Sequence, residues 1–138
     1  MVYSLALILL IFSQLMFSCG TDNRTENTTV TSGTWMLEKI KTGKVSENII
    51  ENPGDYTLRL KNNGSFKLVS DCNKCSGKYT TASKFIKFTE IDCTKKICGK
   101  GSHDYLFRTY IEKASSFKIR GGQLKLGSYK GTMNFSLK

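Results

Sequence analysis

The chain has 138 residues and a formal net charge of +10 at pH 7, from 21 Lys and Arg residues against 11 Asp and Glu residues. This excess favours anionic partners such as lipid head groups, polyanionic surface polymers or nucleic acid, although a basic surface that only keeps the protein soluble explains it equally well. The single His residue leaves few catalytic constellations that depend on a His base.

The first 18 residues contain no charged side chain, and the run from Leu5 to Phe12 is almost entirely apolar. This run is short for a membrane span, which needs roughly 20 apolar residues, so a plain N-terminal membrane anchor is the weaker alternative. Ser18, Cys19 and Gly20 follow it, a pattern that resembles a lipoprotein signal peptidase site. We therefore expect residues 1–18 to be a signal peptide and Cys19 to be the lipid-modified first residue of the exported chain.

The segment after Cys19 is polar, rich in Thr and Asn, and free of aromatic residues up to Ser32. Such a segment buries too little apolar surface to offset the entropy lost on ordering, so we expect residues 19–32 to be a flexible tether. Residues 33–138 then form one domain of ordinary size. The lipid is expected to hold this domain in the cell envelope, on the periplasmic face or at the outer membrane or cell surface.

Apolar and polar residues alternate over much of the chain from Trp35 onward. In the first clear case, Tyr56, Leu58 and Leu60 fall on one face of an extended segment and the polar residues between them fall on the other. The same two-residue period recurs at residues 66–68, 117–119, 124–126 and 133–137. This alternation is typical of half-buried β-strands.

Turn residues separate these strands. Asn-Asn-Gly at 62–64 and Gly-Gly at 121–122 tolerate the positive φ that tight hairpin turns require. They predict hairpins over 56–69 and 116–127, and residues 128–131 are expected to turn the chain into a last strand.

One segment has a helical period instead. Its apolar residues repeat at three-and-four spacing, which predicts one helix from about His103 to Ala114, with Ser102 or Asp104 as a cap. These residues are Leu106, Phe107, Tyr110, Ile111 and Ala114. The sequence thus predicts an all-β, mainly antiparallel fold, a small barrel or sandwich of about eight strands with one α-helix packed on it.

Four cysteines mark the domain: Cys72, Cys75, Cys93 and Cys98. Their spacing comes near that of a structural zinc site. Export favours two structural disulfides instead, for which four cysteines allow three pairings. A third interpretation is a redox-active pair of Cys72 and Cys75 with a thiolate favoured by Lys74, although a strand rather than a helix is expected to follow it.

The block Cys72–Tyr79 (CNKCSGKY), followed after a strand by Thr94–Cys98 (TKKIC) and the amphipathic helix, resembles the META domain family, which includes the heat-shock lipoprotein HslJ. Trp35–Leu37 looks like the opening Trp-x-Leu strand of that family, and Ser116–Leu126 is similar to its closing hairpin. The resemblance covers roughly residues 33–137.

The resemblance implies a compact β structure with one helix and a disulfide between Cys72 and Cys98, the cysteines that match the family. Cys75 and Cys93 are additions to the family pattern, and we infer a second bridge between them. The two nested bridges would tie the strand at 76–80 to the segment that leads into the helix. The family supplies no catalytic motif; its members are exported or surface-associated, and some are linked to heat shock, drug tolerance or secretion.

A search for reactive groups agrees with this expectation. His103, at the expected helix start, is expected to be a solvent-exposed or capping residue, and residues 99–102 lack the spacing of a phosphate-binding loop. Glu90 and Asp92 are expected to face solvent. Aromatic residues beside Lys residues would suit the stacking of nucleic-acid bases. However, these aromatic residues alternate with polar ones along the strands, which directs most of them into the core. These aromatics are Tyr56, Phe66, Tyr79, Phe85, Phe88, Phe117 and Phe135.

The sequence therefore predicts a lipid-anchored cell-envelope protein that is not an enzyme, uses no cofactor or metal, and does not bind nucleic acid. Its partners are expected to be the membrane, through the lipid, and an envelope protein or anionic envelope component that the domain binds or stabilises, in connection with stress. The alternative is a thiol-disulfide or metal-dependent redox protein that uses Cys72 and Cys75.

Overall fold

The computed structural model describes residues 28–43, 46–49 and 53–138. The expected signal peptide, the expected lipidation site at Cys19 and most of the expected tether lie outside the described residues. Within the described ranges, no helix is long and apolar enough to cross a membrane.

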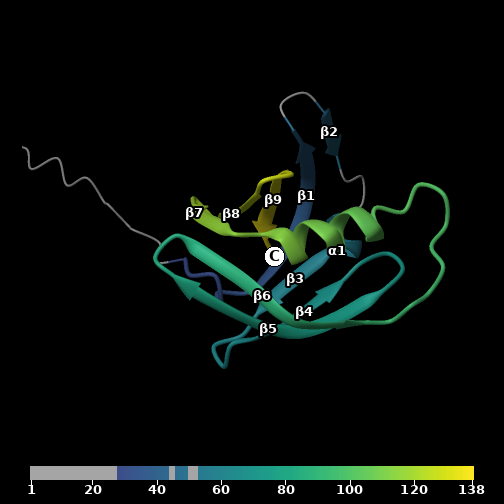
Figure 1. Ribbon diagram of the computed structural model, residues 1–138. Coiled ribbons are helices and arrows are strands. Elements are labelled where there is room, and N and C mark those ends of the chain that lie inside the picture. Colours follow the sequence, from purple (N-terminus) through teal and green to yellow (C-terminus); the bar gives the residue numbers. More distant parts are fainter. Residues whose placement is uncertain (1–27, 44–45, 50–52) are drawn as a thin grey trace, which may run out of the picture.

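Strands dominate the described residues (Figure 1). They are β1 (Thr34–Thr42), β2 (Ser46–Ile49), β3 (Thr57–Leu60), β4 (Ser65–Val69), β5 (Lys74–Ala82), β6 (Phe85–Cys93), β7 (Ser116–Arg120), β8 (Gln123–Ser128) and β9 (Gly131–Leu137). A 3-10 helix, η1, spans Pro53–Asp55, and the α-helix α1 spans Asp104–Lys113.

The strands form one antiparallel sheet that closes on itself. Its order is β2-β1-β3-β4-β5-β6-β7-β8-β9, and β9 also pairs with β1, placing Trp35 opposite Leu137. Every strand of the described chain except β2 therefore belongs to a barrel. β2 pairs only with residues 39–42 of β1, beyond the part of β1 that pairs with β3. The all-β class with one helix is confirmed, and closure leaves few exposed strand edges.

The expected hairpins are present with the expected turn chemistry. β3 and β4 are joined through a turn in which Gly64 has a φ of 78°. β7 and β8 are joined by Gly121 and Gly122, with φ values of 55° and 70°. Two consecutive residues at positive φ are typical of a tight hairpin turn that matches the twist of its strands.

The helix covers an opening in the barrel wall. β6 and β7 share a single residue pair, Phe85 opposite Ser116, and α1 packs on β6, β8 and β9 (Figure 1). The buried side of α1 carries Phe107, Tyr110 and Ile111, as the helical period predicts. The helix therefore seals the core where the strands separate.

The core is filled by the inward faces of the strands and by α1. Trp35, Phe66 and Phe135 are almost completely buried, and the rings of Phe66 and Phe88 meet edge to face at 5.1 Å. Phe85 is an exception among the aromatic residues, because its side chain is 56% exposed. Ile86 and Phe88 occupy the inward face of β6, so the alternation of the strand turns Phe85 outward.

A β-bulge bends the β5–β6 hairpin. The register shifts between Ser76 and Lys78 because β6 contains one extra residue there, and Glu90 at the bulge has a φ of 52°. Gly77 faces this bulge, and a Cβ on Gly77 would lie 2.7 Å from the carbonyl oxygen of Thr89. Only glycine therefore fits the close approach of the two strands.

Candidate functional site

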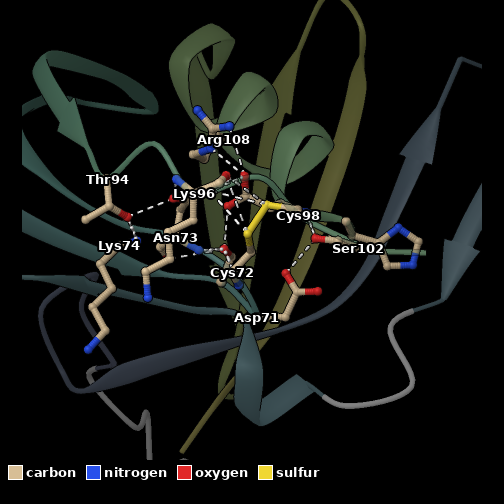
Figure 2. Close-up of a disulfide and its surroundings, with 12 residues drawn as sticks. Asp71, Cys72, Asn73, Lys74, Thr94, Lys96, Cys98, Ser102 and Arg108 are labelled. Carbon is tan, nitrogen blue, oxygen red and sulfur yellow. Dashed lines mark hydrogen bonds and ion pairs between the residues drawn. A yellow bond between two sulfur atoms is a disulfide. The ribbon is translucent and has the colours of Figure 1, made fainter. Parts of the chain in front are cut away.

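Polar and sulfur-containing side chains gather at one end of the barrel (Figure 2). There the turn between β4 and β5 meets the segment 94–103, which leads from β6 to α1. The turn supplies Ser70 and Asn73, and α1 supplies Asp104 and Arg108.

Two disulfides link this end of the domain. Cys72 is joined to Cys98, with their Cα atoms 5.7 Å apart, and Cys75 is joined to Cys93, its direct neighbour across β5 and β6. These are the two pairs expected from the sequence analysis. Because Cys72 and Cys75 have different partners, they do not form the disulfide that a redox-active Cys-x-x-Cys pair requires, and sulfur atoms held in disulfides offer no thiolate to a metal.

A buried carboxylate lies at the centre of the site. The side chain of Asp104 is 1% exposed, and its Oδ2 accepts hydrogen bonds from Asn73 Nδ2 at 3.0 Å and from Arg108 Nε at 2.9 Å. Arg108 Nη2 also lies 2.9 Å from this oxygen, and the hydroxyl of Ser70 donates to the other carboxylate oxygen. Both oxygens of the carboxylate are thus occupied inside the protein.

These donors keep Asp104 ionised. Burial alone would raise the pKa of the carboxyl group, but the hydrogen bonds from Ser70, Asn73 and Arg108 and the positive charge of Arg108 outweigh it and hold the pKa below its ordinary value. A buried charge is tolerated only when it is paired and hydrogen-bonded. The arrangement therefore favours the ionised form of Asp104, which has no proton to donate and is a weaker base than an ordinary carboxylate.

Asn73 connects this carboxylate to the segment 94–103. Its side-chain oxygen accepts hydrogen bonds from the Thr94 hydroxyl at 2.8 Å and from the backbone N–H of Lys96 at 2.9 Å, while its nitrogen donates to Asp104 (Figure 2). Asn73 is 2% exposed. Its side chain thus holds the segment that contains Cys98 and is closed to an outside ligand.

The residue that caps the start of α1 differs from the two expected from the sequence. His103 occupies the N-cap position of α1, and its side chain makes no capping hydrogen bond. The Ser102 hydroxyl, one residue earlier, accepts the backbone N–H of Asp104 at 3.1 Å and donates to Asp71 at 2.8 Å. Ser102 thus satisfies one free N–H at the helix start without being the N-cap residue. The alternative prediction, Asp104 as the cap, is wrong, because Asp104 is the first residue of the helix and its carboxylate turns inward to Asn73 and Arg108. His103 contributes its backbone N–H, which donates to the Tyr56 hydroxyl at 3.0 Å.

A groove of about 810 Å³ lies beside this network, between β6 and α1. Its walls carry apolar, basic and acidic side chains. They include Phe88, Ile91, Lys95, Lys96, Arg108, Glu90, Asp92 and Glu112. Glu90 and Asp92 are exposed, as expected, and Glu90 forms an ion pair with Lys78 at 2.8 Å. Next to the groove, Ile97 is 99% exposed.

The sequence analysis did not identify Ser70, Asp104 and Arg108 as one cluster. The only local signal is the spacing of Asp104 and Arg108, an acidic and a basic residue four positions apart on a helix. Within the part of the chain that the structure describes, no group of three or more His, Cys, Asp or Glu side chains is placed to hold a metal ion. The polar atoms of this cluster mainly bind one another.

Comparisons with known proteins agree with this fold. The family model described as META domain matches residues 28–138. A protein from Burkholderia xenovorans, solved by NMR, is similar with a TM-score of 0.65 and 19% identity over 79% of this chain and 83% of that one. A DUF4847 family protein from Bacteroides vulgatus is similar with a TM-score of 0.59 and 12% identity over 78% of this chain and 93% of that one. A search of curated proteins gave no match.

Proposed function

The chain belongs to the META domain family, and from this premise we propose that it is a non-catalytic binding module held at a bacterial cell-envelope membrane by a lipid on Cys19. The observation that carries the proposal is the pairing of Cys72, Cys75, Cys93 and Cys98 in two disulfides. Structural disulfides persist in oxidising compartments, outside the bacterial cytosol. This supports export, which the apolar segment before Cys19 also favours.

The chemistry of the described site supports a binding role over a catalytic one. A nucleophile needs an effective base within hydrogen-bonding distance, and the Ser70 hydroxyl donates to the carboxylate of Asp104, whose pKa is lowered by Asn73 and Arg108. A carboxylate with a lowered pKa is a weak base, so it activates the hydroxyl poorly. The buried polar groups thus connect the β4–β5 turn to α1. Their arrangement stabilises the end of the barrel and presents a rigid surface.

This surface has features of a protein-binding site. The groove between β6 and α1 combines the apolar Phe88 and Ile91 with side chains of both charges, and Ile97 projects beside it into solvent. A polypeptide partner matches mixed charges and an exposed aliphatic residue better than a uniformly anionic polymer does. We therefore assign the groove to another envelope protein.

Metabolic labelling with a tagged palmitate tests the anchor. Cells that produce the wild-type chain should incorporate the label into this protein, and cells that produce Cys19→Ser should not. Ser18→Ala is the matched control, because it keeps a small residue before Cys19 and should remain labelled. An unlabelled wild-type protein, or equal labelling of Cys19→Ser, would contradict the anchor.

A further inference from the structure

The described chain begins beside β7, far from the disulfide-linked end. Residues 28–30 line a hollow of about 600 Å³ together with residues from the β5–β6 turn and from β7. These residues are Ser83, Lys84, Phe117, Lys118 and Ile119. The Trp35 indole N–H donates to the carbonyl oxygen of Val30 at 2.7 Å, which holds this start of the chain against the barrel. In Figure 1 the purple start of the chain lies at the β5–β6 turn, and segment 94–103 lies at the opposite end.

The outer face of β7 and β8 next to this point is strongly basic. Lys118 lies directly opposite Lys125 in the β7–β8 pairing, and Lys125 lies opposite Asn134 of β9. Lys118, Lys125, Arg120 and Asn134 line a second hollow, of about 160 Å³. Lys118 lines both hollows, so the basic surface continues to the point where the chain enters the domain.

The fold gains little from this arrangement. Like charges directly opposite each other in a sheet are destabilising, and none of the ion pairs found among the described residues includes Lys118, Arg120 or Lys125. The side-chain oxygen of Asn134 is buried among them without a hydrogen-bond partner. An anionic partner would relieve the repulsion between the facing lysines.

An exposed aromatic residue borders the same surface. Phe85 is 56% exposed, the Lys84 ammonium lies 5.7 Å from the centre of its ring, and Phe85 pairs with Ser116, two residues before Lys118 on β7. Apolar side chains next to basic ones suit the boundary between phospholipid head groups and acyl chains. We call Lys84, Phe85, Lys118, Arg120 and Lys125 the basic face.

We propose that the basic face rests on the anionic phospholipid head groups of the membrane that carries the protein. This inference rests on the proposed lipid at Cys19. Thr28 is nine positions after Cys19, and nine residues span at most about 30 Å, so the lipid keeps the basic face near the bilayer. The groove at the opposite end of the barrel then points away from the membrane, towards its protein partner.

Vesicle binding tests the proposal without the lipid. All strand pairings of the barrel lie within residues 34–137, so the exported chain from position 19, made with Cys19→Ser, retains every element of the closed fold. This chain should co-float with vesicles of phosphatidylcholine mixed with phosphatidylglycerol and not with vesicles of phosphatidylcholine alone. Added salt should release it, because the attraction is electrostatic.

Two triple variants with the same loss of charge locate the contact. Lys118→Gln, Arg120→Gln and Lys125→Gln together should weaken binding about a hundredfold, since each basic residue near an anionic membrane contributes roughly fivefold. Lys95→Gln, Lys96→Gln and Lys100→Gln, at the opposite end, form the matched control and should change binding only slightly. Circular dichroism checks that both variants retain the fold.

Absence of binding to the anionic vesicles would overturn the proposal, and so would an equal loss in the two variants, because net charge alone would then explain the attraction. Preference for a soluble polyanion, with no affinity for vesicles, would identify an envelope polymer as the partner instead and would also overturn it. None of these results bears on the palmitate label at Cys19. An unlabelled Cys19 would in turn leave the vesicle result standing, so the two failures are distinguishable.

Discussion

Asn73 donates its side-chain N–H to the carboxylate of Asp104 over 3.0 Å, joining two residues that are 31 positions apart in the chain. Through this contact the turn between β4 and β5 and the first residue of α1 form one unit. Asn73 also accepts hydrogen bonds from Thr94 and Lys96, so one side chain fixes the helix and the segment before it. The stability of this end of the domain should depend on it.

Asn73→Ala should lower the free energy of unfolding by about 2 to 3 kcal/mol, because it removes a donor from a buried carboxylate and leaves buried polar groups without partners. Chemical denaturation with the disulfides intact measures the change. Asn134→Ala is the matched control: its side-chain oxygen has no hydrogen-bond partner, so the loss should stay within about 0.5 kcal/mol. Equal losses in the two variants would contradict the assigned role of Asn73.

Asp104 should make the stability of the domain depend on pH. Its pKa in the folded protein is below the ordinary value of 3.8, so at acidic pH the unfolded chain binds more protons than the folded one. Its contribution is therefore fully present above the ordinary value and is lost as the pH falls through the lower, folded value. Unfolding free energies from neutral pH to about pH 2 should decline less steeply in Asp104→Asn than in the wild type. Parallel curves would contradict the assigned ionisation.

The two disulfides should contribute similarly to global stability but differently to local order. They close loops of 26 and 18 residues, so replacing either pair with Ala should cost about 3 kcal/mol. Cys75 and Cys93 already lie on paired strands, whereas Cys98 lies in a segment outside any strand. Amide hydrogen exchange in residues 94–103 should therefore accelerate more when Cys72 and Cys98 are replaced. Faster exchange in residues 94–103 after replacement of Cys75 and Cys93 than after replacement of Cys72 and Cys98 would contradict this. It would show that the pairing of β5 with β6 does not by itself keep Cys93 in place.

The facing lysines of the basic face should reduce stability. Lys118→Gln removes the repulsion between Lys118 and Lys125 and should raise the free energy of unfolding by about 0.5 kcal/mol while weakening vesicle binding. Lys87→Gln is the control, because Lys87 lies opposite the neutral Thr80. It should produce no such gain. A stability loss in Lys118→Gln would mean that Lys118 serves the fold rather than a partner.

Local features of this fold are readable from the sequence. Gly64, Gly121 and Gly122 mark hairpin turns because positive φ is a property of single residues. The helix follows equally from a local period, and its observed limits, Asp104–Lys113, differ from the predicted ones by one residue at each end. Closure of the barrel through β1 and β9 is not readable in this way, because it pairs residues about 100 positions apart.

The same reasoning explains what was missed at the site. An Asp at a helix start is normally a capping residue, and the sequence offers no sign that Asp104 turns inward. That orientation depends on Ser70 and Asn73, which lie 34 and 31 positions earlier and reach Asp104 only in the folded chain. The cysteines were easier to assign, because the export expected from the N-terminal sequence would limit the chemistry open to them and the family resemblance favours one pairing.

The intact mass of the protein, purified from its own membrane and treated with a thiol-alkylating reagent without reductant, tests the central claim most directly. We predict the mass of a chain that begins at Cys19, increased by the attached lipid and decreased by four hydrogens for the two disulfides, with no alkyl group added. A chain that still begins at Met1 and carries alkyl groups on Cys72, Cys75, Cys93 and Cys98 would contradict the account.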